Sequence, residues 1–155
     1  MIEIASAADL RDRIGQELAV SDWFEVTQAR IDQFADATDD RQWIHVDPAR
    51  AARESPFGAP VAHGFLTLSL CTALARGAMR ARGVAMAVNY GFGRVRFIAP
   101  VPAGSRIRGR FSPSAIEETG GAVQVTWDVA IEREGGDKPC VVAEWIVRYY
   151  GLPPA

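Results

Sequence analysis

The sequence predicts an α+β fold in which a curved antiparallel sheet wraps around one long central helix. Helix-like segments occupy the first half of the chain, and after Gly83 apolar residues recur at every second position, as in half-buried strands. Helices followed by a run of strands are typical of the α+β class. The longest helical segment, Gly64 to Arg82, is apolar or small nearly all round in its first three turns, which predicts a buried position.

The first half of the chain contains several short elements. A poorly patterned helix is expected over residues 7–18, and a short strand over residues 21–26. Thr27 is a suitable N-cap for a helix over residues 28–37, because its hydroxyl can accept from an N–H of the first turn. Asp47 followed by Pro48 predicts another helix to about residue 54, with the aspartate as cap and the proline at the first helical position.

Strand-like alternation dominates the second half. Apolar residues alternate with polar or charged ones over residues 94–97, 106–111 and 123–132, and residues 140–150 are strand-like with weaker alternation. The pairs Gly120-Gly121 and Gly135-Gly136 fall between these runs, where hairpin turns need residues that tolerate positive φ. We therefore expect a five-stranded antiparallel sheet.

Length and composition favour a single domain over residues 1–155. The chain is 48% hydrophobic and 23% charged with a net charge of −2, which is ordinary for a soluble protein and gives no reason to expect a nucleic-acid partner. Cys71 and Cys140 lie far apart in apolar runs and are interpreted as free thiols in a reducing cytoplasm. We find no signal-peptide pattern and no apolar stretch long enough to cross a bilayer, so a cytoplasmic protein without a membrane partner is expected.

The stretch Asp40-Arg41-Gln42-Trp43-Ile44-His45 is the strongest functional signal. Its acid and its imidazole lie five positions apart, which on a continuous helix would place them about 140° apart around the axis. Apolar Trp43 and Ile44, with Pro48 following, instead predict a partly buried irregular loop. Such a loop is costly to build for packing alone. We interpret Asp40 and His45 as a general acid/base pair that can position and deprotonate a water molecule.

The second feature is Ala62-His63-Gly64-Phe65, where the long helix is expected to begin. Unpaired N–H groups and the positive helix end can stabilise an oxyanion there. A glycine lets a substrate carbonyl approach its N–H without a Cβ in the way. For His63, a role in ordering the loop before the helix is more plausible than a reactive role.

These two stretches resemble the hydratase-2 motif of the MaoC-like dehydratases, which include the (R)-specific enoyl-CoA hydratases. That motif runs Gly-Asp-x-Asn-Pro-aliphatic-His and is followed by His-Gly at the central helix; residues 94–104 are similar to the family's strand and turn. The resemblance extends over about residues 23–152. It implies a hot-dog fold, usually a homodimer, that adds water in the syn sense to a trans-2-enoyl-CoA and forms an (R)-3-hydroxyacyl-CoA without a cofactor.

The resemblance also implies roles for individual residues. Asp40 and His45 match the catalytic pair that holds and activates the water. Gly64 matches the glycine whose N–H binds the thioester oxygen, and Thr72 falls where related hydratases have a serine near the substrate.

Three residues depart from the motif. Asp39, Gln42 and Trp43 replace its glycine, asparagine and proline. Aspartate tolerates the left-handed backbone better than most residues, so the turn is expected to survive. The changes therefore affect acyl-chain preference more than chemistry.

Other functions fit parts of the pattern. A thioesterase on the same fold needs a carboxylate to activate water at the carbonyl but has no specific need for His45. A non-catalytic acyl-CoA-binding subunit needs neither group for turnover. Gly64 can also be a simple helix-start glycine, and Thr72 a buried hydroxyl bonded to its own helix.

The remaining polar residues suggest structural roles. The strand arginines are most simply a solvated face, although some could contact CoA phosphates: Arg94, Arg96, Arg106, Arg108 and Arg110. His45 and His63 lack zinc-site spacing relative to the two cysteines, so a metal site is not expected.

Overall fold

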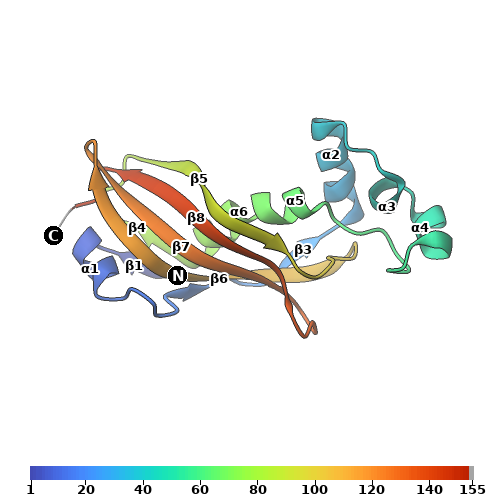
Figure 1. Cartoon of the computed structure of the whole chain (residues 1–155), viewed down its shortest axis with the longest axis horizontal. Coiled ribbons are helices and arrows are strands. Elements are labelled where there is room, and N and C mark those ends of the chain that lie inside the picture. Colours follow the sequence, from blue (N-terminus) through green and yellow to red (C-terminus); the bar gives the residue numbers. More distant parts are fainter. Residues whose placement is uncertain (154–155) are drawn as a thin grey trace.

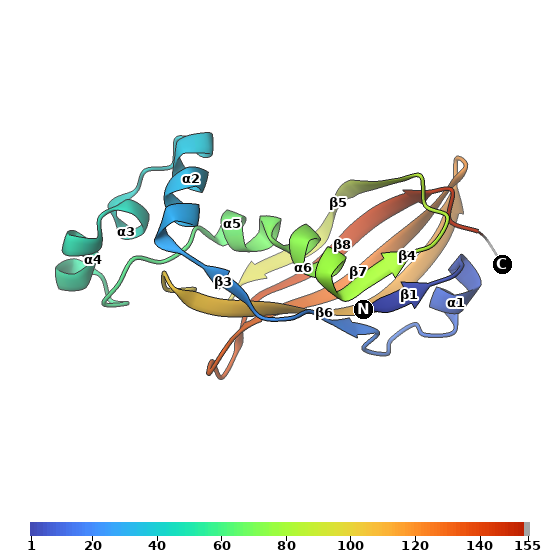
Figure 2. The same cartoon turned by 180° about the vertical axis from the view of Figure 1, so that it is seen from behind.

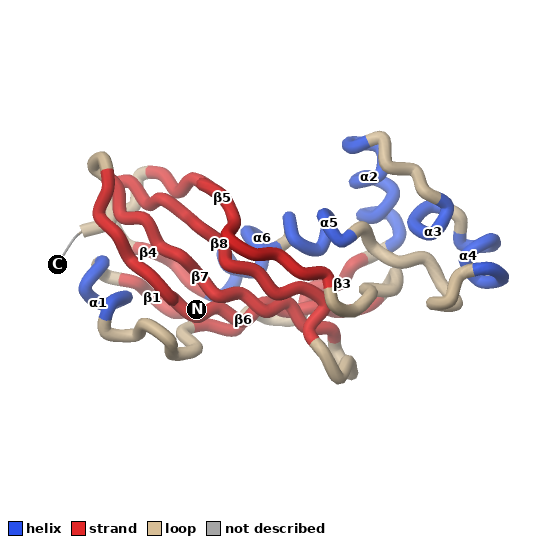
Figure 3. The backbone as a smooth tube through the Cα atoms, in the orientation of Figure 1, coloured by secondary structure: helices blue, strands red, loops and turns tan. Residues whose placement is uncertain are grey.

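The computed structural model describes residues 1–153 and has the predicted α+β architecture. In chain order the elements are β1 (Ile2–Ile4), α1 (Ala7–Arg11), β2 (Ala19–Val20), β3 (Phe24–Val26), α2 (Gln28–Thr38), α3 (Trp43–Val46), α4 (Pro48–Glu54), α5 (Gly64–Ser69), α6 (Cys71–Ala78), β4 (Met79–Ala81), β5 (Met86–Phe97), β6 (Ser105–Thr119), β7 (Ala122–Arg133) and β8 (Pro139–Tyr150). All helices precede the four long strands β5 to β8, as predicted, while the short strands β1 to β4 lie among the helices; Figure 3 distinguishes the two kinds of element by colour.

The large sheet is antiparallel and follows the order β2-β6-β7-β8-β5. β3 also pairs with β6, through residues 105–107, whereas β2 pairs with residues 110–111. The two short strands therefore share one edge, and the sheet has the expected five rows. The predicted turns lie at Gly120-Gly121, between β6 and β7, and at Gly135-Gly136, between β7 and β8; Gly120, Gly121 and Gly135 have positive φ.

The sheet curves around α5 and α6, as in the hot-dog fold that the motif resemblance implies (Figures 1 and 2). Leu66, Leu74 and Cys71 of these helices are buried with Phe111 and Trp127 of the sheet in one apolar core. The segment is therefore central as predicted, but only one of its faces is buried, because Phe65 and Ser69 on the other face are exposed. α2, α3 and α4 lie beyond one end of the sheet (Figure 1).

Two predicted helices are shorter in the structure. The helix expected over residues 64–82 ends at Ala78 and is interrupted at Leu70, whose N–H still bonds to the Leu66 carbonyl. Its last residues form β4 instead, because Met79 is extended and pairs in parallel with Ile2 of β1. The helix expected over residues 7–18 ends at Arg11; further along, the Leu18 N–H bonds to the Phe111 carbonyl of the sheet.

The two capped helices are confirmed. Thr27 accepts from the Arg30 N–H at the start of α2, and Asp47 accepts from the Arg50 N–H at the start of α4. The strand expected over residues 21–26 is confined to residues 24–26, because the Ser21 hydroxyl accepts from the Gly109 N–H at the break between β2 and β3. Within residues 1–153, no helix is both long and apolar enough to cross a membrane.

Candidate active site

Asp40 follows a left-handed turn at the end of α2. The C-cap Asp39 has φ 58° and ψ 13°, and it is the only non-glycine residue with positive φ in the described chain. The expectation that an aspartate can replace the motif glycine at this turn is confirmed. Because the turn stops α2 before Asp40, the acid and the imidazole are not held on one continuous helix.

His45 lies on α3, a single turn that begins only at Trp43. The stretch predicted as an irregular loop therefore contains a short helix. The His45 side chain is buried, and its Nδ1 is 2.6 Å from the Val61 carbonyl oxygen. A carbonyl can only accept, so Nδ1 holds the ring proton and the neutral ring has its lone pair on Nε2. That tautomer provides a base at Nε2.

His63 lies directly behind this pair. Its ring stacks on His45 with centroids 3.8 Å apart and planes inclined by 27°, and it is only 2% exposed. Its Nε2 donates to the Asp40 main-chain carbonyl at 2.9 Å, while the Asp40 carboxylate is 4.0 Å from the same nitrogen. The structure thus brings Asp40, His45 and His63 together, with one ligand-type atom of each within 4.8 Å of the others.

Burial lowers the pKa of His45 below its ordinary value, and the nearby His63 acts in the same direction. The hydrogen bond to Val61 and the Asp40 carboxylate act in the opposite direction and do not cancel the effect of burial. His45 is consequently neutral around pH 7, which is the form that can accept a proton.

Gly64 begins α5, immediately after His63. A Cβ on this residue would lie 2.9 Å from two ring carbons of Phe97, so the close approach of that ring by itself favours glycine here. Gly64 and Thr67 line a cavity of about 330 Å³ whose other walls include the end of β5, residues 98–101 and the start of β8. The cavity therefore adjoins the residue that begins α5.

Thr72 is not part of this cluster. It lies eight residues along the helical segment from Gly64, an axial rise of about 12 Å. Its hydroxyl accepts from the side-chain Nδ2 of Asn89 at 3.4 Å, and the side-chain Oδ1 of Asn89 accepts from Trp145 Nε1 at 3.2 Å. All three line a second cavity of about 410 Å³. Bonding of a hydroxyl to its own helix occurs at Thr67 and Ser69 instead.

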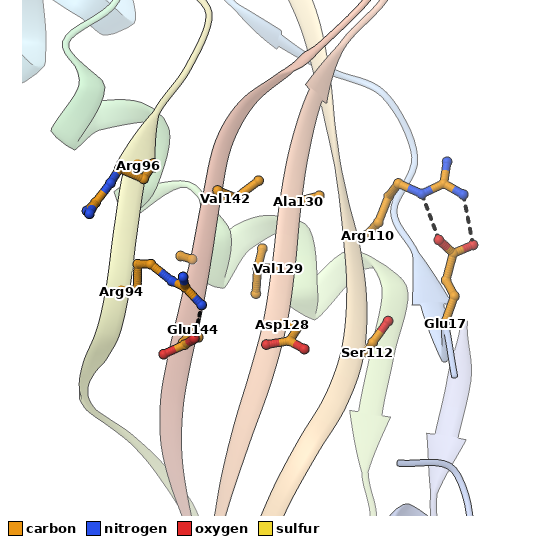
Figure 4. Close-up of a pocket in the computed structure, with 11 residues that line it drawn as sticks. Glu17, Arg94, Arg96, Arg110, Ser112, Asp128, Val129, Ala130, Val142 and Glu144 are labelled. Atoms are coloured by element: carbon orange, nitrogen blue, oxygen red, sulfur yellow. Dashed lines mark hydrogen bonds and ion pairs between the residues drawn. The ribbon is translucent and has the colours of Figure 1, made fainter. Parts of the chain in front are cut away.

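The strand arginines form the solvated face that the alternation indicates. On the outer face of the sheet, Arg94 pairs with Glu144 at 2.9 Å and Arg110 with Glu17 at 2.6 Å, around a shallow hollow of about 640 Å³ (Figure 4). Arg106 and Arg108 pair with Glu134 and Glu132. Since acids pair with most of these arginines, the solvated-face interpretation is the one that the ion pairs support.

The His–His–Asp cluster has metal-binding groups but an unsuitable arrangement. His45 Nδ1 and His63 Nε2 are already bonded to carbonyl oxygens. Each ring therefore has only one nitrogen left as a ligand, and the two rings are stacked on each other. The cluster therefore fits acid/base chemistry better than metal binding.

Comparison with known proteins identifies the family. Residues 9–134 match the MaoC-like domain. The chain belongs to the MaoC-like dehydratase family. It is 50% identical over 145 residues to 3-hydroxyacyl-thioester dehydratase Z of Mycobacterium tuberculosis, covering 93% of this chain and 95% of that protein. It is 52% identical over 143 residues to nodulation protein N of Rhizobium leguminosarum, covering 91% and 89%.

The solved structures agree with the family assignment. The (R)-hydratase from A. caviae involved in PHA biosynthesis superposes with a TM-score of 0.66 at 25% identity, over 90% of this chain and 96% of that one. The predicted hot-dog fold and family are thus confirmed, as is the predicted enzyme class of this MaoC-like chain, a dehydratase (hydro-lyase).

Proposed function

We propose that this MaoC-like chain catalyses the reversible syn addition of water to trans-2-enoyl-CoA, giving (R)-3-hydroxyacyl-CoA. The observation that supports this most directly is the His45 tautomer: Nδ1 is bonded to the Val61 carbonyl, which leaves Nε2 as a base, and one ring nitrogen of His45 lies within 4.8 Å of an Asp40 carboxylate oxygen. The 50% identity to a 3-hydroxyacyl-thioester dehydratase supports the same reaction class.

In the hydration direction, the Asp40 carboxylate and His45 Nε2 hold one water molecule. His45 takes a proton from the water as the water oxygen bonds to C3, and the electrons of the double bond move toward the thioester carbonyl. The proton then passes from His45 to C2. Because His45 lies on the face from which the water attacks, oxygen and hydrogen are added to the same face.

Gly64 stabilises the negative charge that develops on the thioester oxygen. Its backbone N–H belongs to the first turn of the central helix, where no helical carbonyl is available as partner. A donor preorganised at the developing charge is typically worth about 10²- to 10³-fold in turnover. The cavity beside Gly64 supports this placement of the thioester.

Thr72 contacts the acyl part of the substrate in this proposal. The cavity that it lines is mostly apolar, with Ala75, Met79 and Val147 among its walls. A chain extending along the helix from Gly64 would reach Thr72 after about 12 Å.

We further propose a homodimer that works in the cytoplasm. β5 is a sheet-edge strand with exposed Tyr90 and Phe92, and exposed Phe65 packs edge-on against Phe97 at its end. A long apolar edge is a template for pairing with another chain. Sedimentation at micromolar concentration tests the dimer, and a stable monomer would refute it. The two buried free cysteines are compatible with a reducing compartment.

Incubation with crotonyl-CoA tests the proposed reaction. A hydratase consumes the conjugated double bond, measured by ultraviolet absorbance, without releasing free CoA thiol. Release of the thiol would indicate a thioesterase instead. A wild-type protein that binds enoyl-CoA of every chain length tested but converts none of them would be a binding subunit, and the hydratase proposal would fail.

A further inference from the structure

The Asp40 carboxylate has little support of its own. It is about half exposed, and within residues 1–153 no hydrogen bond to its oxygens is formed by another side chain; its contact with His63 Nε2 is 4.0 Å long. Its position therefore depends on the main chain of the loop. That main chain is held at Asp40 by His63, whose Nε2–H donates to the carbonyl across 23 residues of sequence.

The other end of the loop is held in the same way. Gln28, in the first turn of α2, donates from Nε2 to the main-chain carbonyl of His45 at 2.8 Å. The same amide nitrogen donates to Asp32, one turn further along α2, also at 2.8 Å. Asp32 thus orients the Gln28 amide, and through Gln28 the helix α2 fixes the main chain at His45.

His63 and Gln28 each contain a buried acceptor atom that has no hydrogen-bond partner within residues 1–153. Among the described residues, the only buried side-chain nitrogen or oxygen atoms without a hydrogen-bond partner are Gln28 Oε1 and His63 Nδ1. An unsatisfied buried acceptor lowers stability. Phenylalanine at position 63 would keep a flat ring against His45 without an unpaired atom. The polar side chains of Gln28 and His63 therefore do not maximise the stability of the fold. Their hydrogen bonds instead fix the position of the Asp40–His45 loop.

We infer that His63 and Gln28 are positioning residues for the proposed hydratase site: His63 holds Asp40, and Gln28 holds His45, each through the main chain. This inference rests on the proposed function. Displacement of a catalytic group by about 1 Å costs on the order of 10²-fold in rate. Loss of either contact should therefore lower turnover while the thioester is still bound.

Two substitutions at position 63 separate the donor from the ring. His63→Phe keeps the ring and removes the donor, so kcat for crotonyl-CoA should fall on the order of 10- to 100-fold with KM nearly unchanged and no loss of thermal stability. His63→Gln can place an amide N–H near the position of Nε2 and should retain more kcat than His63→Phe. Gln28→Leu should lower kcat in the same way.

Ser21→Ala provides the matched control. Ser21 is also buried, and its hydroxyl accepts from the Gly109 N–H far from the loop. This variant should lose stability and keep kcat. If His63→Phe loses stability and keeps wild-type kcat, as the control does, the positioning role is refuted.

A double-mutant cycle with Asp40→Asn decides whether His63 acts through Asp40. The losses should be strongly sub-additive, because His63 has nothing to position once the carboxylate is absent. Fully additive losses would overturn the inference. The proposed function fails separately, if the wild-type protein converts no enoyl-CoA or if Asp40→Asn alone keeps the wild-type rate with crotonyl-CoA.

Discussion

Gly64→Ala separates the two reasons for a glycine at the start of the central helix. The added Cβ would lie 2.9 Å from Cγ and Cδ1 of Phe97 and 3.1 Å from Cε1, so the ring or the helix start must move. Overpacking typically costs about 1–3 kcal/mol. The Phe97 ring is 48% exposed and can turn outward, which favours the lower end, about 1 kcal/mol.

The loss of activity should exceed the loss of stability. A methyl group at position 64 blocks the approach of the thioester carbonyl to the N–H, and loss of such a donor costs about 10²- to 10³-fold in kcat. The assay is crotonyl-CoA hydration at saturating substrate, together with thermal unfolding of the same samples.

Phe97→Ala supplies the matched second variant. Removing the ring relieves the contact, so the double variant Gly64→Ala/Phe97→Ala should be more stable than Gly64→Ala. Its kcat should still be low compared with that of Phe97→Ala alone. If relieving the contact restores turnover in full, Gly64 matters only for packing. Near wild-type turnover of Gly64→Ala itself would also refute the oxyanion role.

Three further predictions concern the same site and its surroundings. Asp40→Asn and His45→Gln should each lower kcat by about 10²-fold or more with little change in substrate binding, and near-normal turnover of either variant would refute its role. Since burial lowers the pKa of His45, the acid limb of the kcat/KM profile should lie below the ordinary histidine value of 6.5, with activity falling as pH drops through the limb and His45 gains a proton; a limb above 6.5 would contradict the described environment. Arg94→Gln should leave KM for crotonyl-CoA within about 2-fold and stability within about 1 kcal/mol, because its pair with Glu144 is an exposed surface ion pair; a large rise in KM would instead indicate a contact with the CoA phosphates.

Local patterns in the sequence were sufficient where neighbouring residues decide the conformation. Thr27 and Asp47 cap their helices as predicted because a cap contacts an N–H only three residues away. Asp39 takes up the left-handed turn because its short polar side chain tolerates positive φ. The alternation of residues 123–132 predicted β7 because one face of that strand packs on the core.

Element ends and supporting contacts were less predictable. The central helix stops at Ala78 because Met79 pairs with β1, a partner more than 70 residues earlier in the chain. Gln28 was expected only as the first residue of a helix, and its bond to the His45 carbonyl spans 17 residues. Nothing in the local pattern around Gln28 indicates such a contact.

The sequence by itself determined the family, the α+β class and the acid, base and glycine proposed for catalysis, because these depend on residue types at short spacing. Only the tertiary structure decided how the site is assembled. The Val61 carbonyl selects the His45 tautomer, and His63 and Gln28 hold the loop from behind. Thr72 lies apart, in a second cavity. These contacts join residues 16 to 23 positions apart or lie on different elements, so they exist only after the chain has folded.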